Sequence, residues 1–230
     1  GDKAKAKEQY VIVTSKAGNS NMEEALAKLA EIQYDQQEYE PAVETMQKLL
    51  AVAQSTENRQ AAKIGLLRSY TMLDKTDESI EAASQLISGD NLDPAIRREA
   101  LYSRAKANEK KGNTADAFTD YKELSDNCLD KYGAEAKYRV AEYLNNGYKS
   151  AEAEKEIFDF IDKNTPHQYW LAKSFLLLAD IYMQQGNDFE AKQYLLSLKE
   201  NYKGEDDIAG EIKVRLDQIS QKEMQKVVNE

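Results

Sequence analysis

The stretch that decides the fold runs from residue 169 to residue 198 and reads YWLAKSFLLLADIYMQQGNDFEAKQYLLSL. Apolar side chains over 175–182 recur at the spacing of one helical face. The Gly186-Asn187 pair marks a turn, and a second run of helical period follows it. The stretch therefore predicts two helices joined by a tight turn. Ala179 and Ala191 are small because the two helix axes approach closely where they cross.

This arrangement returns about every 37 residues along the whole chain. The small residue of the second helix recurs as Ala42, Ser79, Ala117, Ala153 and Ala191, and that of the first helix as Ala30, Leu67, Ala105, Ala141 and Ala179. Only Leu67 is large, so the second pair of helices must pack differently from the others. A period of 20 to 50 residues is typical of a solenoid, in which each unit packs on its neighbours.

The predicted fold is therefore all-α, a single solenoid of antiparallel helix pairs. Its predicted units are a half repeat over 1–18, repeats over 20–55, 58–91, 93–131, 133–165 and 168–203, and a terminal helix over 206–228. The predicted hairpin turns are Gln36-Gln37, Lys75-Thr76, Gly112-Asn113, Asn146-Gly147 and Gly186-Asn187. A capping box at Ser20–Glu23 and an N-cap with a first-turn proline at Asp93-Pro94 predict two helix starts, and Pro41 is expected to open another helix.

The two ends of the chain differ from the units between them. Ala6 lies 36 residues before Ala42, so the ladder of second helices extends to it and the chain begins halfway through a unit, after a turn at Gly1-Asp2. The terminal helix has no partner. We expect the chain to be a fragment of a longer repeat protein. The alternative is a complete protein whose unpaired helices act as caps.

Composition and motifs argue against several functions. The formal net charge of −10 argues against duplex nucleic acid, which is bound through cationic contacts to phosphate. The sequence contains no phosphate-binding glycine loop, zinc spacing or serine nucleophile elbow, and no apolar run long enough to span a bilayer. His167 is expected in a solvated loop and Cys128 as a packing thiol. We therefore expect neither an enzyme nor a cofactor or metal.

The double ladder, the tyrosines of the repeats and the Gly-Asn turns resemble the tetratricopeptide repeat, and the resemblance covers essentially the whole chain. The resemblance implies an α-α superhelix. The repeat is longer than the usual one of about 34 residues. Such a longer repeat is similar to the repeats of bacterial envelope proteins. The segments 131–136 and 201–204 resemble the loops of that group. This resemblance implies a location in the bacterial periplasm or at the outer membrane, with the cytoplasm as the alternative.

In this family the first helices line a concave groove. Carried over by position, one row of the groove comprises Ala27, Ile64, Tyr102, Tyr138 and Leu176, a charged row comprises Glu31, Arg68, Lys106, Glu142 and Asp180, and a third row comprises Tyr34, Thr71, Glu109, Asn145 and Met183. We expect Tyr102 and Tyr138 to be exposed in the groove, with Arg68 and Lys106 forming a basic spot. The bland alternative is that the tyrosines only pack between repeats. The lysine and asparagine clamp of chaperone-binding relatives is missing from these positions.

The predicted function is a non-enzymatic scaffold that holds a peptide or partner protein in the groove. The alternative is a carbohydrate-associated envelope protein, because groove tyrosines could also stack on sugar rings. The candidate partner-binding residues are Tyr34, Arg68, Tyr102, Lys106, Tyr138, Glu142, Leu176, Asp180 and Met183. Aromatic and arginine side chains are the usual anchors of binding surfaces.

Overall fold

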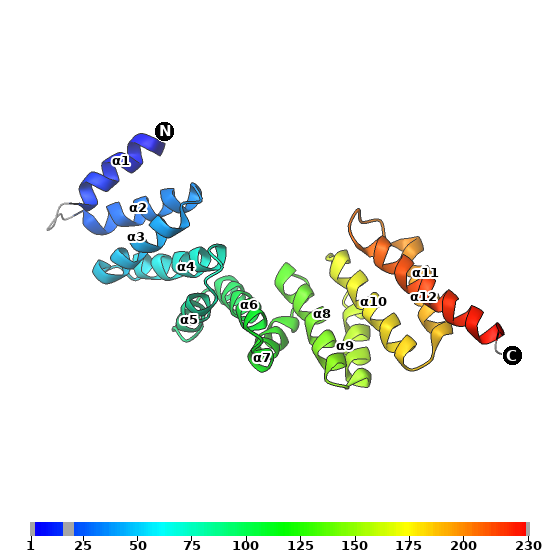
Figure 1. The fold of residues 1–230 in the computed structure, drawn as a ribbon. Helices are drawn as coiled ribbons and strands as arrows, with labels where there is room; N and C mark the ends of the chain where they lie inside the picture. The colour runs from blue at the N-terminus through cyan, green and yellow to red at the C-terminus, as the bar shows by residue number, and fades with distance from the viewer. Residues whose placement is uncertain (1–2, 16–20, 229–230) are drawn as a thin grey trace. The chain divides into compact units, whose positions relative to one another are not determined.

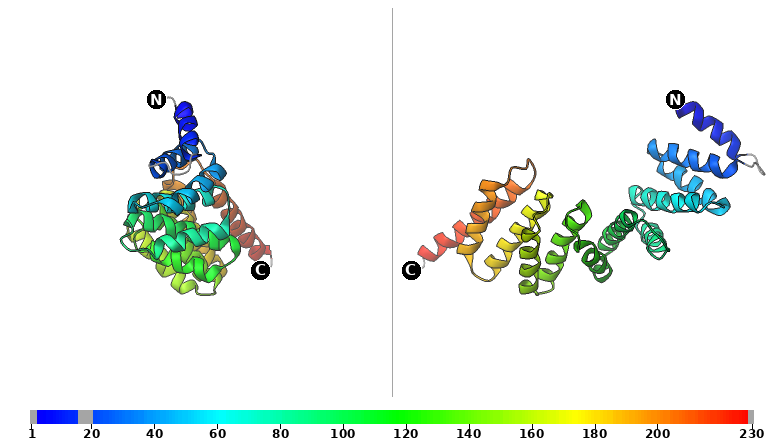
Figure 2. Two further views of the ribbon diagram at one scale, coloured as in Figure 1. Left: turned by 90° about the vertical axis from the view of Figure 1, so that its left-hand side faces the viewer. Right: turned by 180° about the vertical axis from the view of Figure 1, so that it is seen from behind.

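The computed structural model describes residues 3–15 and 21–228, and within these ranges all regular structure is α-helical (Figures 1 and 2). The helices are α1 (Lys3–Thr14), α2 (Met22–Asp35), α3 (Tyr39–Val52), α4 (Thr56–Met72), α5 (Thr76–Ile87), α6 (Pro94–Lys111), α7 (Thr114–Ser125), α8 (Lys131–Asn146), α9 (Ser150–Asp162), α10 (Gln168–Gln184), α11 (Asp188–Asn201) and α12 (Ile208–Val228). The all-α prediction is confirmed. Among the described residues, every helix is too short or too polar to cross a membrane.

The chain divides into two compact units, residues 1–117 and 118–230, and the boundary falls within α7. In unit 1 the first helices α2, α4 and α6 pack side by side, and α3 and α5 pack between them on the second layer. In unit 2 the helices α8, α10 and α12 pack in the same order, with α9 and α11 behind them. Each unit is therefore built from antiparallel helix pairs in two layers.

The small residues of the two ladders lie where the helices cross. Ala42, Ala105, Ala117, Ala141, Ala153, Ala179 and Ala191 have no exposed surface at all. Close packing leaves no room for a larger side chain at these crossings. Leu67 is also buried, and it packs against Ala83 and Ala100, so small residues on neighbouring helices make room for it.

The hairpin turns share one backbone feature at a fixed place in the repeat. Gln37, Asp74, Gly112, Tyr148 and Gly186 have φ angles of 62°, 58°, 78°, 60° and 80°, one in each turn between paired helices. Glycine adopts this left-handed conformation without strain, aspartate and asparagine tolerate it, and most other residues lose about 1–2 kcal/mol in it. In the fourth turn the sequence suggested Gly147 as the turn glycine, but Gly147 has a φ of −85° and the neighbouring Tyr148 takes the left-handed position. The predicted turn is therefore displaced by one residue.

Tyr148→Gly should raise the free energy of unfolding by about 0.5–1 kcal/mol, because it removes a left-handed strain that glycine does not have. The side chain is 98% exposed, so little packing is lost with it. Urea unfolding of both proteins measures the change. Gly186→Ala, at the equivalent left-handed position, is the matched control and should be destabilising by about 1 kcal/mol. A loss of stability in Tyr148→Gly would contradict the strain.

The predicted helix starts are partly confirmed. Asp93 caps α6 by accepting from the backbone N–H groups of Ala95 (2.7 Å) and Ile96 (3.3 Å), and Pro94 is the first helical residue. Pro41 lies in the first turn of α3, which begins two residues earlier at Tyr39.

The predicted capping box and the predicted N-terminal turn lie partly or wholly outside the described residues. Ser20 of the expected capping box and the turn at Gly1-Asp2 lie outside the described residues. The Glu23 carboxylate binds the backbone N–H groups of Gln54 (3.0 Å) and Ser55 (3.1 Å), which links α2 to the start of α4.

The segment 131–136 is helical, so its expected loop structure is wrong. Asp130 is the N-cap of α8, and its carboxylate accepts a hydrogen bond from the backbone N–H of Gly133 (2.8 Å). The helix therefore begins at Lys131. A glycine near a helix start therefore did not mark a loop here. The other predicted loop segment, 201–204, leaves the helix after Asn201, as expected.

Ion pairs link successive repeats within each unit. Unit 1 contains Lys110–Asp74 and Lys111–Asp77, and unit 2 contains Lys122–Glu156, Lys173–Glu211, Arg215–Asp180 and Lys222–Asp188. The partners are 34 to 38 residues apart, which is the length of one repeat. Each cation therefore pairs with an acid at a comparable height in the neighbouring repeat.

Candidate functional site

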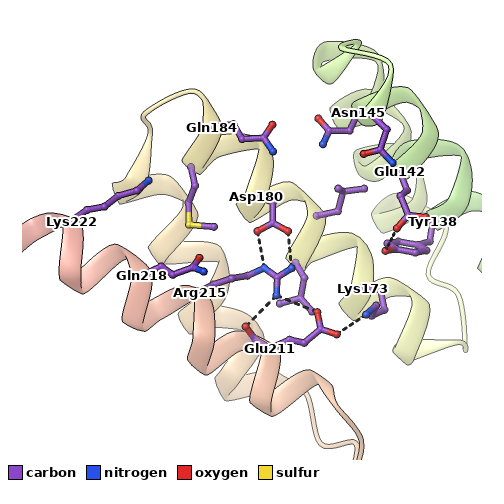
Figure 3. Close-up of a pocket in the computed structure, with 14 residues that line it drawn as sticks. Tyr138, Glu142, Asn145, Lys173, Asp180, Gln184, Glu211, Arg215, Gln218 and Lys222 are labelled. Carbon is purple, nitrogen blue, oxygen red and sulfur yellow. Dashed lines mark hydrogen bonds and ion pairs between the residues drawn. The ribbon is translucent and has the colours of Figure 1, made fainter.

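A pocket of about 460 Å³ lies on the first-helix layer of unit 2 (Figure 3). Its walls are α8, α10 and α12, which pack side by side. We call it the carboxamide pocket, because its polar lining includes Asn145 and Asn146 of α8, Gln184 of α10 and Gln218 of α12. It also contains an apolar floor and six charged side chains, three acidic and three basic.

The charged side chains are held by one another. Arg215 of α12 binds Asp180 of α10 through two parallel hydrogen bonds of 2.8 Å and 2.7 Å, and its guanidinium also contacts Glu211 at 3.1 Å. Lys173 donates to the other oxygen of Glu211 at 2.6 Å (Figure 3). Burial alone would lower the pKa of Arg215, but its contacts with Asp180 and Glu211 outweigh burial and raise the pKa. The network therefore stays ionised and ties α12 to α10.

Tyr138 forms part of the pocket wall, but it is buried. Only 9% of the residue is exposed, its ring stacks on Trp170 with centroids 5.6 Å apart, and its hydroxyl donates to Glu142 at 2.7 Å. Burial and the hydrogen bond to Glu142 raise the pKa of the hydroxyl. The expectation that Tyr138 would be exposed as a groove anchor is therefore wrong, because its ring and its hydroxyl both have internal partners.

The carboxamides and the apolar floor face the space of the pocket. Leu176 is buried, while Leu177 and Met183 are partly exposed. Figure 3 shows the side chains of Asn145 and Gln184 pointing toward each other across the mouth. Each carboxamide carries both a hydrogen-bond donor and an acceptor. The pocket thus offers paired donors and acceptors around a small apolar surface, with no excess of charge.

The predicted site residues fall into separate places. Tyr138, Glu142, Leu176, Asp180 and Met183 line the carboxamide pocket. Tyr34 and Arg68 line a different hollow, between α2 and α4 in unit 1. Lys106 lines a third pocket, beside the turn between α4 and α5, and Tyr102 is a half-buried residue of α6. Because Tyr102 and Tyr138 belong to different units, a groove that joins them stays a prediction.

The expected basic spot is neutralised by nearby acids. Arg68 forms a two-pronged pair with Glu99 at 2.6 Å and 2.7 Å, and Lys106 lies 3.4 Å from Glu109. Both acids come from α6, so the cationic charge of the two residues is balanced locally. Arg68 and Lys106 are therefore partly exposed and paired with acids, and their role as a basic spot for a ligand stays a prediction.

The remaining candidates for chemistry have structural surroundings. Cys128 is buried against Ala134 and Phe160, and burial raises the pKa of its thiol. His167 lies at the N-terminal end of α10. Among the described residues, no three histidine, cysteine, aspartate or glutamate side chains cluster as metal ligands would.

Sequence reasoning missed the contribution of α12. Arg215, Gln218 and Lys222 line the pocket, although the terminal helix was expected only to lack a partner. The repeat spacing contained a signal for this. Gln218 follows Asp180 by 38 residues, and Lys222 follows Gln184 by the same repeat length. The rows of pocket residues therefore extend onto α12.

Comparisons with known proteins agree with this geometry. The family model described as "Tetratricopeptide repeat" matches residues 24–53 and 169–204, which correspond to the pairs α2/α3 and α10/α11. A comparison with curated protein sequences finds no significant match.

Two solved structures are similar to the chain in fold. The crystal structure of MamA is 14% identical with a TM-score of 0.57, and the match covers 84% of this chain and 97% of that chain. The crystal structure of a Podosopora anserina putative kinesin light chain with nearly identical TPR-like repeats is 17% identical with a TM-score of 0.54, covering 77% of this chain and 93% of that one. Two of its helix pairs, α2/α3 and α10/α11, thus match the tetratricopeptide-repeat model, and the chain shares the all-α fold of these solved structures.

Proposed function

We propose that the chain is a non-enzymatic scaffold whose carboxamide pocket holds an extended peptide segment of a partner protein. Tetratricopeptide repeats generally mediate protein–protein interaction, and the family is generally non-enzymatic. The observation that carries the proposal is the set of carboxamides that three successive first helices bring to one pocket. A peptide backbone presents alternating donors and acceptors, which carboxamides can satisfy in pairs.

The charge balance of the pocket supports a ligand that is not strongly charged. Lys173 and Arg215 already bind acids of the same pocket, and Lys222 binds Asp188 at 2.9 Å. A charged ligand would have to displace one of these internal partners. An uncharged backbone with a small apolar side chain over Leu177 and Met183 would displace none.

The carbohydrate alternative has less support. Sugar rings stack on exposed aromatic faces, whereas Tyr138 is the one aromatic residue among the residues that line the pocket, and its ring lies against Trp170. We therefore favour a polypeptide. The bacterial envelope remains our proposal for the compartment, on the resemblance of the long repeat unit. Cell fractionation of the natural gene product tests that proposal, and a purely cytoplasmic protein would refute it.

The test of function begins with peptides selected from a random twelve-residue phage library on the full chain. Gln184→Ala/Gln218→Ala should weaken their binding roughly tenfold or more, because each lost hydrogen bond contributes about 0.5–1.5 kcal/mol. Gln193→Ala/Gln221→Ala, at exposed glutamines outside the pocket, is the matched control and should leave the affinity unchanged. Fluorescence anisotropy measures the affinities.

A second measurement separates backbone recognition from side-chain recognition. N-methylation of the central amides of a selected peptide should abolish binding, since it removes backbone donors. Two results together would exclude the carboxamide pocket as the site. In the first, the selected peptides bind Gln184→Ala/Gln218→Ala as tightly as the natural chain. In the second, their N-methylated forms bind as tightly as the unmodified peptides. A positive glycan array with no selected peptide would favour the carbohydrate alternative instead.

A further inference from the structure

Unit 1 contains a second hollow, of about 600 Å³, between the first helices α2 and α4. Its floor consists of Ala30, Met46, Leu49 and Ala62, each at most 6% exposed. Its walls consist of further small or aliphatic residues, Ala27, Ala61, Ile64 and Gly65. We call it the alanine hollow. The floor residues are almost fully covered, so a ligand in the hollow would contact mainly the walls, where Ala27, Ile64 and Gly65 are partly exposed and Ala61 at the edge is exposed.

Gly65 keeps Met46 at the floor of the hollow. A Cβ atom added to Gly65 would lie 2.5 Å from the Sδ and Cε atoms of Met46, so the thioether packs directly on the backbone of α4. Methionine has three rotatable bonds and a polarisable sulfur, which lets it adapt to apolar groups of different shape. The floor is therefore suited to an aliphatic or aromatic anchor.

The rim of the hollow is acidic overall. Glu24, Glu31 and Asp35 of α2 line it, together with Lys28 and Arg68. Lys28 lies 3.1 Å from Glu31, and Arg68 is held by Glu99, which adds a further carboxylate beside the rim. The two cations thus have acidic partners, and the four carboxylates outnumber them. A ligand with positive charge beside its apolar anchor complements this rim.

We infer that the alanine hollow is a second docking site, for a polypeptide segment whose apolar anchor is flanked by lysine or arginine. The inference rests on the proposed function in one respect, that the ligand is a polypeptide. It differs in ligand chemistry, because the carboxamide pocket has balanced charge and a polar lining. A partner with an uncharged extended segment and a basic apolar segment would engage the chain through both sites.

The test uses a fluorescein-labelled fourteen-residue peptide with leucines at the spacing of one helical face and flanking lysines. Two twins replace the lysines by glutamates or the leucines by serines. Anisotropy with the full chain at moderate salt should give binding of the leucine-lysine peptide, and each twin should bind at least tenfold more weakly. Equal binding of the serine twin would mean unspecific attraction to an acidic protein, and equal binding of the glutamate twin would mean that the rim plays no part. Either result overturns the inference.

Variants place the peptide on the molecule. Ala61→Trp should fill the hollow and weaken binding at least tenfold, while Ala151→Trp, at an exposed alanine of α9, should leave it unchanged. Circular dichroism and thermal melting confirm folding of both variants. Unchanged affinity in Ala61→Trp would overturn the inference. Gln184→Ala/Gln218→Ala should not affect this peptide, and a loss there would place it in the carboxamide pocket, again overturning the second site. Failure of the proposed function would appear with the library-selected peptides, in the glutamine double variant and the N-methylated forms, and not with the leucine-lysine peptide, so the two failures are distinguishable.

Discussion

Phe160→Ala is expected to lower the free energy of unfolding by about 3–5 kcal/mol, the cost of removing a large buried aromatic ring and leaving a cavity. Phe160 has no exposed surface, and it packs with Cys128 and Ala134 against Trp170 and Leu171. These residues come from α8, α9, α10 and the segment before α8, so the ring joins consecutive repeats of unit 2. Urea unfolding followed by circular dichroism measures the loss.

Phe158→Ala is the matched control. Phe158 lies two residues earlier on the same helix and is 36% exposed, so its removal should cost about 1–2 kcal/mol, less than the removal of Phe160. Equal losses in the two variants would mean that the inward face of α9 has been assigned wrongly. A small loss in Phe160→Ala alone would mean that the neighbouring repeats close over the cavity.

Lys137→Met should lower the free energy of unfolding by about 2–3 kcal/mol. The side chain of Lys137 is 8% exposed and lies 2.6 Å from both Glu156 and Asp159. Losing the ammonium group removes the positive charge that pairs with these two carboxylates. The cost is moderated because Asp159 is half-exposed and Lys122 still pairs with Glu156. Lys122→Met is the control. Its side chain is 48% exposed, so its pair should contribute about 1 kcal/mol at most.

The pH dependence of the Lys137 effect has a definite sign. The hydrogen bond from Lys137 lowers the pKa of Asp159, and burial of Glu156 is outweighed by its bonds to Lys122 and Lys137, so its pKa is lowered too. Their contribution is present above the unfolded pKa values of about 4. It is lost as the pH falls through the lower folded values.

Burial opposes the charge of Lys137, but its bonds to Asp159 and Glu156 raise its pKa above 10.5. That contribution is therefore lost only as the pH rises through the raised value. The difference between the natural chain and Lys137→Met should be largest between about pH 5 and pH 10. Unfolding curves at pH 3, 7 and 10 measure it. A difference that grows below pH 4 would contradict the pairing.

The helix pairs could be predicted from the sequence because one physical requirement repeats. A close helix crossing needs a small side chain, and that need leaves a visible ladder such as Ala105, Ala141 and Ala179. The fourth turn was placed less accurately, because a turn is predicted from the position of its glycine. The hairpin instead requires the left-handed conformation at a fixed place in the repeat. That place is occupied by Tyr148, one residue after Gly147.

The candidate site was predictable in position but not in chemistry. Family positions placed Leu176 and Asp180 on the face that the carboxamide pocket occupies. They did not reveal that Asp180 is bound by Arg215 or that Tyr138 is covered by Trp170. Partners of side chains depend on rotamers and on the spacing between neighbouring helices, and neither is read from a single sequence. The polar character of the pocket emerged only after these internal partners were known.

The ion pairs between successive repeats have a consequence for how such a chain can change by recombination. Losing or duplicating one repeat through unequal crossing-over would preserve the ladder of small residues, so the helices of the product could still stack. It would not preserve every pair, since Asp74 needs Lys110 and Asp180 needs Arg215 in the adjoining repeat. The exposed Lys110–Asp74 pair contributes only about 0–1 kcal/mol. The ion pairs thus specify which repeats are neighbours. A chain with rearranged repeats could still fold, but neighbouring repeats would lack their charged partners.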